Sequence, residues 1–463
     1  MIKSRMFIRC VLDNIYSFGR TTEINMFPAP RFSRLKNHKY QVGNGIEVLK
    51  LASFYGANGS GKSNLVLAIE FLRNLVVSSD LPSPFLLKRM KHFHSTDKPT
   101  LLAIEFLIEG KAYLYALELG ERSVLKEELY ISGLGKSEDI LIFERSTTGD
   151  GKTSLQLSEE NMQNKEILLL KEILEKNLIK PNKTALKIIA DLENPVFYHV
   201  CQAFRWFEQK LVTVTPTSKP LGLPHLLDID ESFHKYAEDL LCSFDVGIKK
   251  ILTTQKTIEE FFGDDNKQVM DKIVRNLENR TESMVGYINE RGEEVVIVVQ
   301  NNKIVVKQLQ TLHEDRNGKQ VIFNVSEESD GSQRLIEFLP AFRNLLASDV
   351  TYFIDELERS IHPLLIIEII KKFSKDMTTK GQLIFTTHES NLLNQEFFRQ
   401  DEIWFVEKDT SGCTDLYSLC DFKEHNTKDI QKGYLTGRYG AIPFLTNLND
   451  LNWDKYDFKE PPI

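Results

Sequence analysis

Apolar and polar positions alternate with two different periods along this chain of 463 residues. Residues 46–55 (IEVLKLASFY) form an alternating-to-apolar run, which predicts a buried strand. Beyond an interval rich in glycine, residues 64–78 (NLVLAIEFLRNLVVS) carry apolar side chains at helical spacing. The pattern therefore predicts a strand, a glycine-rich loop and a helix in direct succession.

The rest of the chain divides into strand-like and helix-like stretches. Short apolar runs predict two more buried strands, at 350–354 and from 382 to His388. Longer periodic stretches predict antiparallel strands over 100–132 and 284–325 and charged helices over 158–177, 183–210 and 230–281. None of the helices sustains the three or four heptads of a long coiled coil, so we expect a compact helical lid between two blocks of strands.

The glycine-rich interval, Gly56 to Ser63 (GANGSGKS), has the spacing GxxxxGK[ST] of a phosphate-binding P-loop. Glycines let the backbone aim N–H groups at phosphate oxygens, and the following helix adds its positive dipole end. Lys62 is expected on the β/γ phosphates, and the Ser63 hydroxyl on Mg²⁺. The alternative is a glycine-rich turn before an ordinary helix. The predicted ATP-binding residues here are Gly56, Asn58, Gly59, Ser60, Gly61, Lys62, Ser63 and Asn64.

Two carboxylates follow the strand at 350–354, at the end where open α/β sheets bind ligands. We expect Asp355 to hold Mg²⁺ together with Ser63, and Glu356 to act as the general base for the attacking water. A solvated acidic strand end is the alternative. Lys62 and Asp355 lie 293 positions apart, which requires a large insertion between the two halves of the nucleotide-binding fold.

Two further motifs occur in the order expected for an ATP-binding cassette. ESDGSQRL (328–335) opens a helical pattern, and Ser329 and Gly331 are predicted to form a second anion site at its start, unless they merely cap the helix. QLIFTTHE (382–389) is a strand ending at His388, which we expect to reach the γ-phosphate rather than pack in the core. Between them, LERSIHP (357–363) occupies the place of the D-loop, which crosses the dimer interface in such ATPases.

Composition narrows the class of protein. The formal net charge is −8 and 41% of residues are hydrophobic, which excludes wholesale disorder and a uniformly basic DNA-coating protein. No apolar run approaches the roughly 20 residues needed to cross a bilayer. Five scattered cysteines without a CxxC pair argue against zinc and disulfide frameworks, so we expect a cytoplasmic protein with no membrane contact.

Taken together, the motifs resemble the AbiLi-type (abortive-infection) branch of the OLD-like, ABC-class ATPases, related more distantly to Rad50, RecF and SMC heads. NIYSF (14–18), DEIWFVEKD (401–409) and YLTGRYGAIP (434–443) add to the resemblance. It implies an α/β fold: an ABC-type, split P-loop ATPase head with an antiparallel β-subdomain. We expect residues 1–150 and 285–463 to form the two halves of this head, with residues 151–284 as a helical lid insertion.

The resemblance also implies partners and a role. Two copies would sandwich ATP, and the ATPase would control a separately encoded nuclease or toxin effector in antiphage defence, released by a phage-derived trigger. Only 75 residues follow His388, too few for the Toprim nuclease domain of full OLD proteins, and Asp228 and Asp230 are expected to be helix caps or solvated.

Two features keep alternatives open. No glutamine occurs between Gln41 and Gln156, where cassette ATPases carry their Q-loop, so Glu105, Glu127 or Glu128 would have to substitute and hydrolysis would be slow. The second hypothesis is a RecF- or Rad50-like DNA-repair ATPase acting directly on DNA. The candidates for DNA contact, against solvated surface charge, are Arg31, Arg34, Lys36 and Lys39, and Lys88, Arg89, Lys91, His92 and His94.

Overall fold

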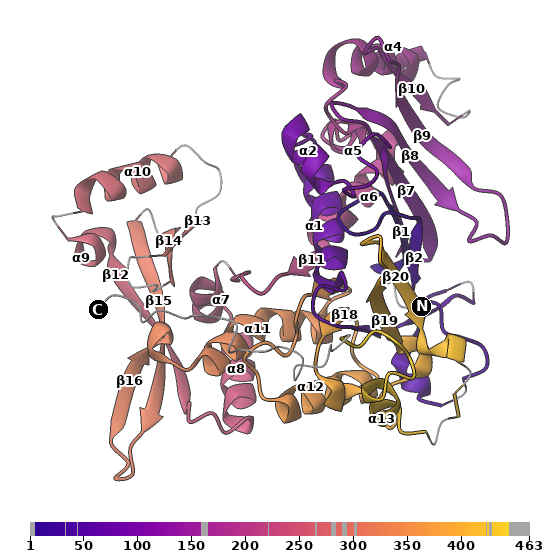
Figure 1. The fold of residues 1–463 in the computed structure, drawn as a ribbon. Helices are drawn as coiled ribbons and strands as arrows, with labels where there is room; N and C mark the ends of the chain where they lie inside the picture. Colours follow the sequence, from indigo (N-terminus) through magenta and orange to yellow (C-terminus); the bar gives the residue numbers. More distant parts are fainter. Residues whose placement is uncertain are drawn as a thin grey trace, which may run out of the picture.

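The computed structural model describes residues 5–443 except 33, 44, 159–164, 221, 264–265, 279–283, 289–293, 301–302, 423 and 426–427. Its strands form three main sheets, with helices between and around them (Figure 1). Across this described part of the chain, no helix is long and apolar enough to cross a membrane.

A mostly parallel sheet forms the centre of the head, in the order β11-β17-β18-β5-β19-β20. All of its pairs are parallel except that of β19 with β20. β5, β17 and β18 are buried along their whole length, as their continuous apolar sequences predict. The strands are β5 (Leu51–Tyr55), β11 (Leu211–Val214), β17 (Thr351–Ile354), β18 (Gln382–Thr387), β19 (Ile403–Lys408) and β20 (Thr414–Ser418).

An antiparallel sheet stands against this head, in the order β10-β9-β8-β7-β6-β1-β2, which confirms the predicted β-subdomain. Helices α1 (Lys62–Ser78), α5 (Ala185–Ala190) and α6 (Tyr198–Gln209) share one hydrophobic core with it. The strands are β1 (Arg5–Asp13), β2 (Thr22–Asn25), β6 (Thr100–Ile108), β7 (Lys111–Leu119), β8 (Val124–Ser132), β9 (Ile140–Thr147) and β10 (Thr153–Leu157). Two short strands, β3 (Lys39–Gln41) and β4 (Glu47–Leu49), pair with each other before β5.

The opposite face of the central sheet is covered by α8 (Glu231–Ser243), α11 (Asp330–Ala347) and α12 (Pro363–Lys375). The alternation of side chains across the strands divides them between the two cores: Phe353 faces α1, whereas Tyr352 and Ile354 face α11 and α12. The central sheet is therefore sandwiched between helices, as an α/β fold requires. The remaining helices are α2 (Pro84–Met90), α4 (Lys165–Ile173), α7 (Leu223–Ile229), α9 (Ile258–Phe262), α10 (Lys267–Glu278) and α13 (Ile430–Leu435).

The expected helical lid over residues 151–284 is wrong as a single unit. β10 completes the antiparallel sheet and β11 extends the central sheet, pairing in parallel with β17. The last part of the expected lid, from β12 onward, instead joins residues 285–324, which were expected in the C-terminal half of the head, in a third sheet of order β12-β15-β14-β13. Helices α9 and α10 pack on this sheet over a small core of their own. The strands of the third sheet are β12 (Lys250–Thr257), β13 (Met284–Ile288), β14 (Glu294–Gln300), β15 (Lys303–Glu314) and β16 (Gln320–Asn324), which pairs with β15.

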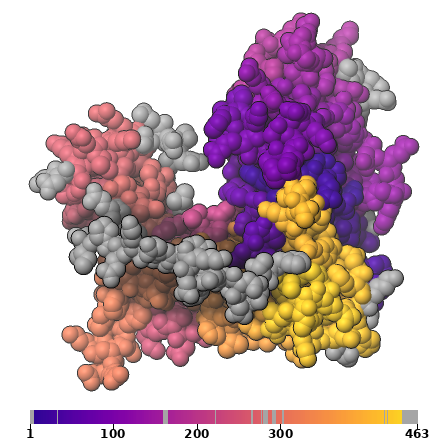
Figure 2. Space-filling model, in the orientation of Figure 1, coloured from indigo at the N-terminus to yellow at the C-terminus, as the bar shows by residue number. Residues whose placement is uncertain are grey.

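This third sheet and the β-subdomain rise from the head as two separate outgrowths with a hollow between them (Figure 2). We call the unit formed by β12–β16, α9 and α10 the accessory sheet. It joins the head through α7 and α8, and β15 leads through β16 directly into the start of α11.

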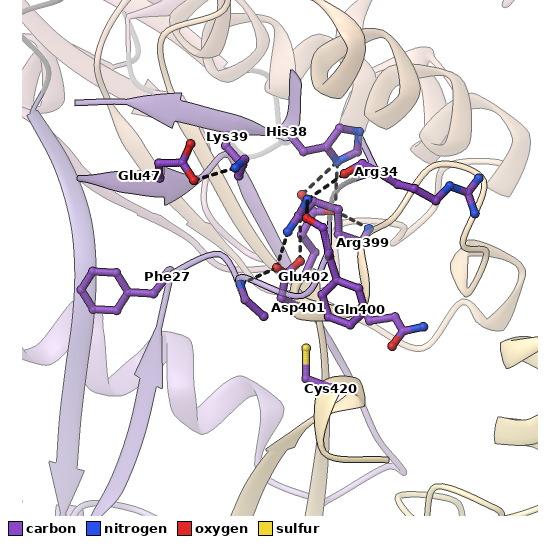
Figure 3. Close-up of polar contacts among 12 residues, drawn as sticks. Phe27, Arg34, His38, Lys39, Glu47, Arg399, Gln400, Asp401, Glu402 and Cys420 are labelled. Carbon is purple, nitrogen blue, oxygen red and sulfur yellow. Dashed lines mark hydrogen bonds and ion pairs between the residues drawn. The ribbon is translucent and has the colours of Figure 1, made fainter. Parts of the chain in front are cut away.

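A buried polar network fastens the segment before β3 to the start of β19 (Figure 3). His38 Nδ1 lies 2.9 Å from Glu402 Oε1, and both side chains are fully buried. Arg399 Nη2 pairs with Asp401 Oδ2 at 2.5 Å, and Asp401 also accepts the backbone N–H of Ala29 at 2.8 Å. The contacts of His38 with Glu402 and of Ala29 with Asp401 join the segment before β3 to the start of β19, and Arg399 Nη1 donates to the Arg34 carbonyl oxygen at 2.8 Å across the same junction.

Candidate functional site

The P-loop lies between β5 and α1, as predicted. Gly59 (φ 77°) and Gly61 (φ 113°) have left-handed backbone conformations that side chains disfavour. α1 begins at Lys62, so its first N–H groups have no partners within the helix and, with the helix dipole, suit an anion. Asn58 and Gly59 are exposed, and the buried Ser60 Oγ has no hydrogen-bond partner in the described residues. The loop therefore fits a phosphate chain.

The side chain of Lys62 folds back over the P-loop. Its Nζ donates hydrogen bonds to the carbonyl oxygens of Gly56 (2.7 Å) and Ala57 (3.1 Å) and lies 3.4 Å from His388 Nδ1. Burial lowers the pKa of the Lys62 ammonium to about 8, against the opposing attraction of nearby carboxylates, of which Glu358 contributes most. The structure thus brings together Lys62 and His388, the two residues that were predicted from the sequence to contact the γ-phosphate.

Asp355 and Glu356 lie at the carboxyl end of β17, beside the end of β18. Thr386 Oγ1 donates to Asp355 Oδ1 at 2.5 Å and accepts the backbone N–H of Glu356 at 2.9 Å. Glu356 has a left-handed φ of 50°, a strained conformation for a side chain that is typical of functional sites. The turn therefore separates the two carboxylates: Asp355 is buried against Thr386, whereas Glu356 is partly exposed.

The donor set suits magnesium. Asp355 is a carboxylate at the sheet edge, and Ser63 is exposed in the first turn of α1. Mg²⁺ usually takes one or two protein oxygens and fills its shell with water and nucleotide phosphates. The described residues contain no cluster of three His, Cys, Asp or Glu side chains that could hold a metal ion.

A hydrogen-bonded collar around the P-loop was missed by sequence reasoning. Thr414 Oγ1 of β20 lies 2.8 Å from the Ser60 carbonyl oxygen and 2.7 Å from Ser17 Oγ, which also accepts from Asn64 Nδ2 at 2.8 Å. A Cβ on Gly61 would approach Thr414 Oγ1 to 2.1 Å. The collar explains why the NIYSF segment and β20 belong to the site, and why Gly61 cannot carry a side chain.

The second anion site lies at the start of α11. Ser329 is the N-cap, and its Oγ accepts the backbone N–H of Ser332 at 3.2 Å. A Cβ on Gly331 would lie 2.7 Å from the Ser360 carbonyl oxygen, so this glycine allows the D-loop segment to pack against the helix start. Ser329 and Gly331 thus contact Ser332 and Ser360 rather than the P-loop of the same chain.

The candidates for the missing Q-loop glutamine have other partners, all in or against the antiparallel sheet. Glu105 accepts hydrogen bonds from Arg9 Nε and Ser132 Oγ, both at 2.5 Å. Glu127 is buried and caps α5 through two backbone N–H groups, and Glu128 pairs with Lys126 at 2.7 Å. Their contacts are those of structural residues, so the geometry favours none of them as a substitute.

The candidates for DNA contact divide between exposed and buried residues. Those that are exposed or partly exposed are Arg31, Arg34, Lys36, Lys39, Lys88, Arg89 and His94. Lys91 and His92 are buried, and Lys91 Nζ bonds to backbone carbonyl oxygens, so neither presents charge to DNA. Asp230 caps α8, as expected, through the N–H of Phe233. Asp228, expected to cap a helix or be solvated, instead pairs with the buried Lys307 at 2.5 Å.

Comparison with known proteins places this geometry in a family. Residues 51–162 and 204–394, more than half of the chain, match the family model described as "AAA domain, putative AbiEii toxin, Type IV TA system". The chain belongs to this family of AAA ATPases. No curated protein matches the chain. The family match is broader than the AbiLi-type, OLD-like resemblance, which stays a prediction.

Two solved SMC heads are among the structures similar to this AAA-family chain. One is the SMC head domain from Thermotoga maritima, at 12% identity over 89% of this chain and 98% of that chain, with a TM-score of 0.36. The other, from Pyrococcus furiosus, has an extended coiled coil and is bound to the C-terminal domain of ScpA; the identity is 13% over 94% and 99% of the two chains, with a TM-score of 0.39. The sheet order of this chain confirms the predicted α/β fold with its antiparallel β-subdomain, with the lid corrected as described above.

Proposed function

We propose that this AAA-family chain binds ATP with Mg²⁺ and hydrolyses it at a site shared by two copies. The observation that supports it most is the meeting of three elements at one edge of the central sheet. Lys62 of the P-loop lies 3.4 Å from His388 after β18, and Asp355 and Glu356 after β17 are close enough to act on the charge of both.

Each side chain has a role that follows from its position. Lys62 and the first turn of α1 bind the β- and γ-phosphates, and Ser63 and Asp355 hold the magnesium ion, which neutralises the charge that develops on the phosphates. Glu356 takes a proton from the water that attacks the γ-phosphorus, and ADP leaves on the opposite side. Partial burial and the adjacent Lys62 lower the pKa of His388, so its ring is neutral at neutral pH and does not repel Lys62.

A second copy would complete the site. Ser329 is exposed at the start of α11, where a helix N-terminus and a serine hydroxyl suit an anion, and within the described residues its hydroxyl bonds to Ser332. We infer that Ser329 and Gly331 of one copy contact the γ-phosphate held by Lys62 of the other. Such a site forms only when ATP joins the two copies.

In the cell, the finer proposal is a sensor or scaffold subunit of an antiphage abortive-infection system that restrains a separately encoded nuclease or toxin. The family description, with its putative toxin and type IV toxin–antitoxin system, supports this setting. The alternative is a RecF- or Rad50-like ATPase acting on DNA. Lys91 and His92 of the expected basic cluster are buried, but Lys88, Arg89 and His94 beside them are exposed. DNA-stimulated turnover and salt-sensitive duplex binding would favour that alternative.

The shared site can be tested by complementation between two inactive variants. Lys62→Ala should lose ATP binding, and Ser329→Ala combined with Gly331→Arg should bind ATP but not hydrolyse it. An equimolar mixture should recover turnover, because mixed dimers contain one intact site. Exposed Lys88→Ala is the control and should hydrolyse ATP normally. Failure of the mixture, with wild-type turnover intact, would refute the shared site.

The role in defence needs a separate assay. Glu356→Gln should bind ATP and dimerise while turnover falls by about a hundredfold or more, because the general base is lost. Cells carrying the chain with its neighbouring gene should restrict phage plaques, and Lys62→Ala should abolish the restriction. Undiminished restriction by Lys62→Ala would count against a nucleotide-dependent role.

A further inference from the structure

A third carboxylate, Glu358, lies under the site and has no role in the predictions from sequence. It stands two residues beyond Glu356, and its side chain turns back toward the end of β18. Glu358 Oε1 accepts the backbone N–H of His388 at 2.6 Å. Leu357 fixes the same turn, because its N–H donates to the Thr386 carbonyl oxygen at 3.2 Å.

The environment of Glu358 disfavours the ionised form of its carboxylate. Its Oε2 is buried and has no hydrogen-bond partner among the described residues. Burial raises the pKa of Glu358, and the neighbouring Glu356 adds to this effect. Hydrogen bonds from the backbone N–H groups of His388 and Glu358 and from the Thr387 side chain oppose this rise, and the bond from His388 is the one that connects Glu358 to the site.

The neighbours of His388 show what this hydrogen bond does. His388 follows the last residue of β18, its side chain is partly buried, and its Nδ1 lies 3.4 Å from Lys62 Nζ. Glu358 is the carboxylate with the largest favourable effect on the Lys62 ammonium. One side chain thus holds the backbone of His388 and balances the cation that the His388 ring faces.

We propose that Glu358 is the positioning residue that holds His388 beside Lys62, so that ATP turnover depends on Glu358 through His388. This inference rests on the proposed ATPase function. The hydrogen bond from the His388 N–H to Glu358 sets the position of the His388 backbone, and thereby of the ring that lies beside Lys62. Glu358 touches neither nucleotide nor water in this role.

Two substitutions separate the hydrogen bond from the charge. Glu358→Gln keeps an acceptor for the His388 N–H, whereas Glu358→Ala removes it. Glu358→Ala should lower kcat about tenfold and change KM for ATP less than about threefold, because the group acts at the γ-phosphate rather than in overall binding. Glu358→Gln should lie between Glu358→Ala and the wild type.

The neighbouring carboxylate offers a matched control. Glu389 accepts the backbone N–H of Asn391 at 3.0 Å and leaves the N–H of His388 alone. Glu389→Ala should therefore keep the wild-type kcat. Thermal unfolding and binding of a fluorescent ATP analogue should show that each variant is folded.

A double-mutant cycle tests the dependence on His388. In the wild type, His388→Ala should lower kcat by about tenfold or more, and in the Glu358→Ala background by less than about twofold, because coupled residues are not additive. Fully additive losses would overturn the inference. So would a wild-type kcat in Glu358→Ala.

NMR spectroscopy tests the positioning role of Glu358 without relying on ATP turnover. The imidazole NMR signals of His388, assigned by their loss in His388→Ala, should shift in Glu358→Ala and stay in place in Glu389→Ala. An unmoved His388 signal would refute the positioning role even in an active enzyme. If the wild-type chain hydrolyses no ATP but the signal moves, the proposed function fails and the positioning stands.

Discussion

Lys62→Met should change how the stability of the protein depends on pH. Lys62 is 4% exposed, and burial lowers the pKa of its ammonium from 10.5 to about 8. Between these two values the unfolded chain keeps a proton that the folded chain has released. The free energy of unfolding therefore rises as pH increases through this window.

The size of the effect follows from the two pKa values. Between pH 7 and pH 9.5, the linkage relation gives a rise of about 2 kcal/mol from Lys62 alone. Methionine has nearly the same length but no titratable group, so this rise should disappear in Lys62→Met. ATP binding should be lost as well, because the charge on the phosphates then has no ammonium partner.

Urea unfolding, followed by tryptophan fluorescence at several pH values in this range, measures the slope. Lys50→Met is the matched control: Lys50 is 1% exposed, burial lowers its pKa to about 8, and its Nζ donates to the Asp376 carbonyl oxygen at 2.8 Å, away from the P-loop. Lys50→Met should flatten the pH dependence to a similar extent but leave ATP binding intact.

The reasoning would be refuted by one result in particular. If Lys62→Met keeps the pH slope of the wild type while Lys50→Met loses part of it, the ammonium of Lys62 is solvated rather than buried in the loop. The arrangement of Lys62 against Gly56, Ala57 and His388 would then be wrong.

Four further substitutions test the surroundings of the site. Gly61→Ala should abolish nucleotide binding and lower the free energy of unfolding in urea by about 2 kcal/mol or more, because its Cβ would meet Thr414 Oγ1 at 2.1 Å. Gly59→Ala is the control: a Cβ there has nothing within 4 Å, so this substitution should cost only about 1 kcal/mol of backbone strain. Thr414→Val should weaken ATP binding about threefold to tenfold by calorimetry, since it removes the contact with the Ser60 carbonyl oxygen; an unchanged Kd would exclude a role for the collar. Glu127→Gln should cost about 1–3 kcal/mol in thermal unfolding, because this buried carboxylate caps α5, but should leave the Kd for ATP unchanged.

Sequence analysis predicted those parts of the site whose residues all lie within one short segment of the chain. The P-loop needs only a strand, glycines and Lys62 before a helix, and Asp355 needs only a buried strand before it. Such local patterns predict the structure well, because the backbone next to these residues sets the geometry of the site. These local patterns were therefore enough to predict that the P-loop and Asp355 lie at the edge of the sheet.

The errors and omissions came from contacts between distant segments. β11 has only four residues and is a strand because it pairs with β17, so its sequence alone gave no reason to separate it from the expected lid. Thr414 reaches Ser60 across 354 positions, and Glu358 reaches His388 across 30. Single-sequence reasoning has no access to such pairings, because any threonine or glutamate could serve.

The order of strands in the central sheet has a consequence for biosynthesis. β5 pairs on one side with β18 and on the other with β19, and Ser53 of β5 bonds to Glu402 across 349 positions. As the chain leaves the ribosome, the P-loop strand therefore waits for most of the protein to be made before either neighbour exists. A premature stop anywhere before β18 would leave a fragment that carries the P-loop sequence without a nucleotide pocket. Nonsense mutations across this long stretch should all behave as complete losses, with no partially active product.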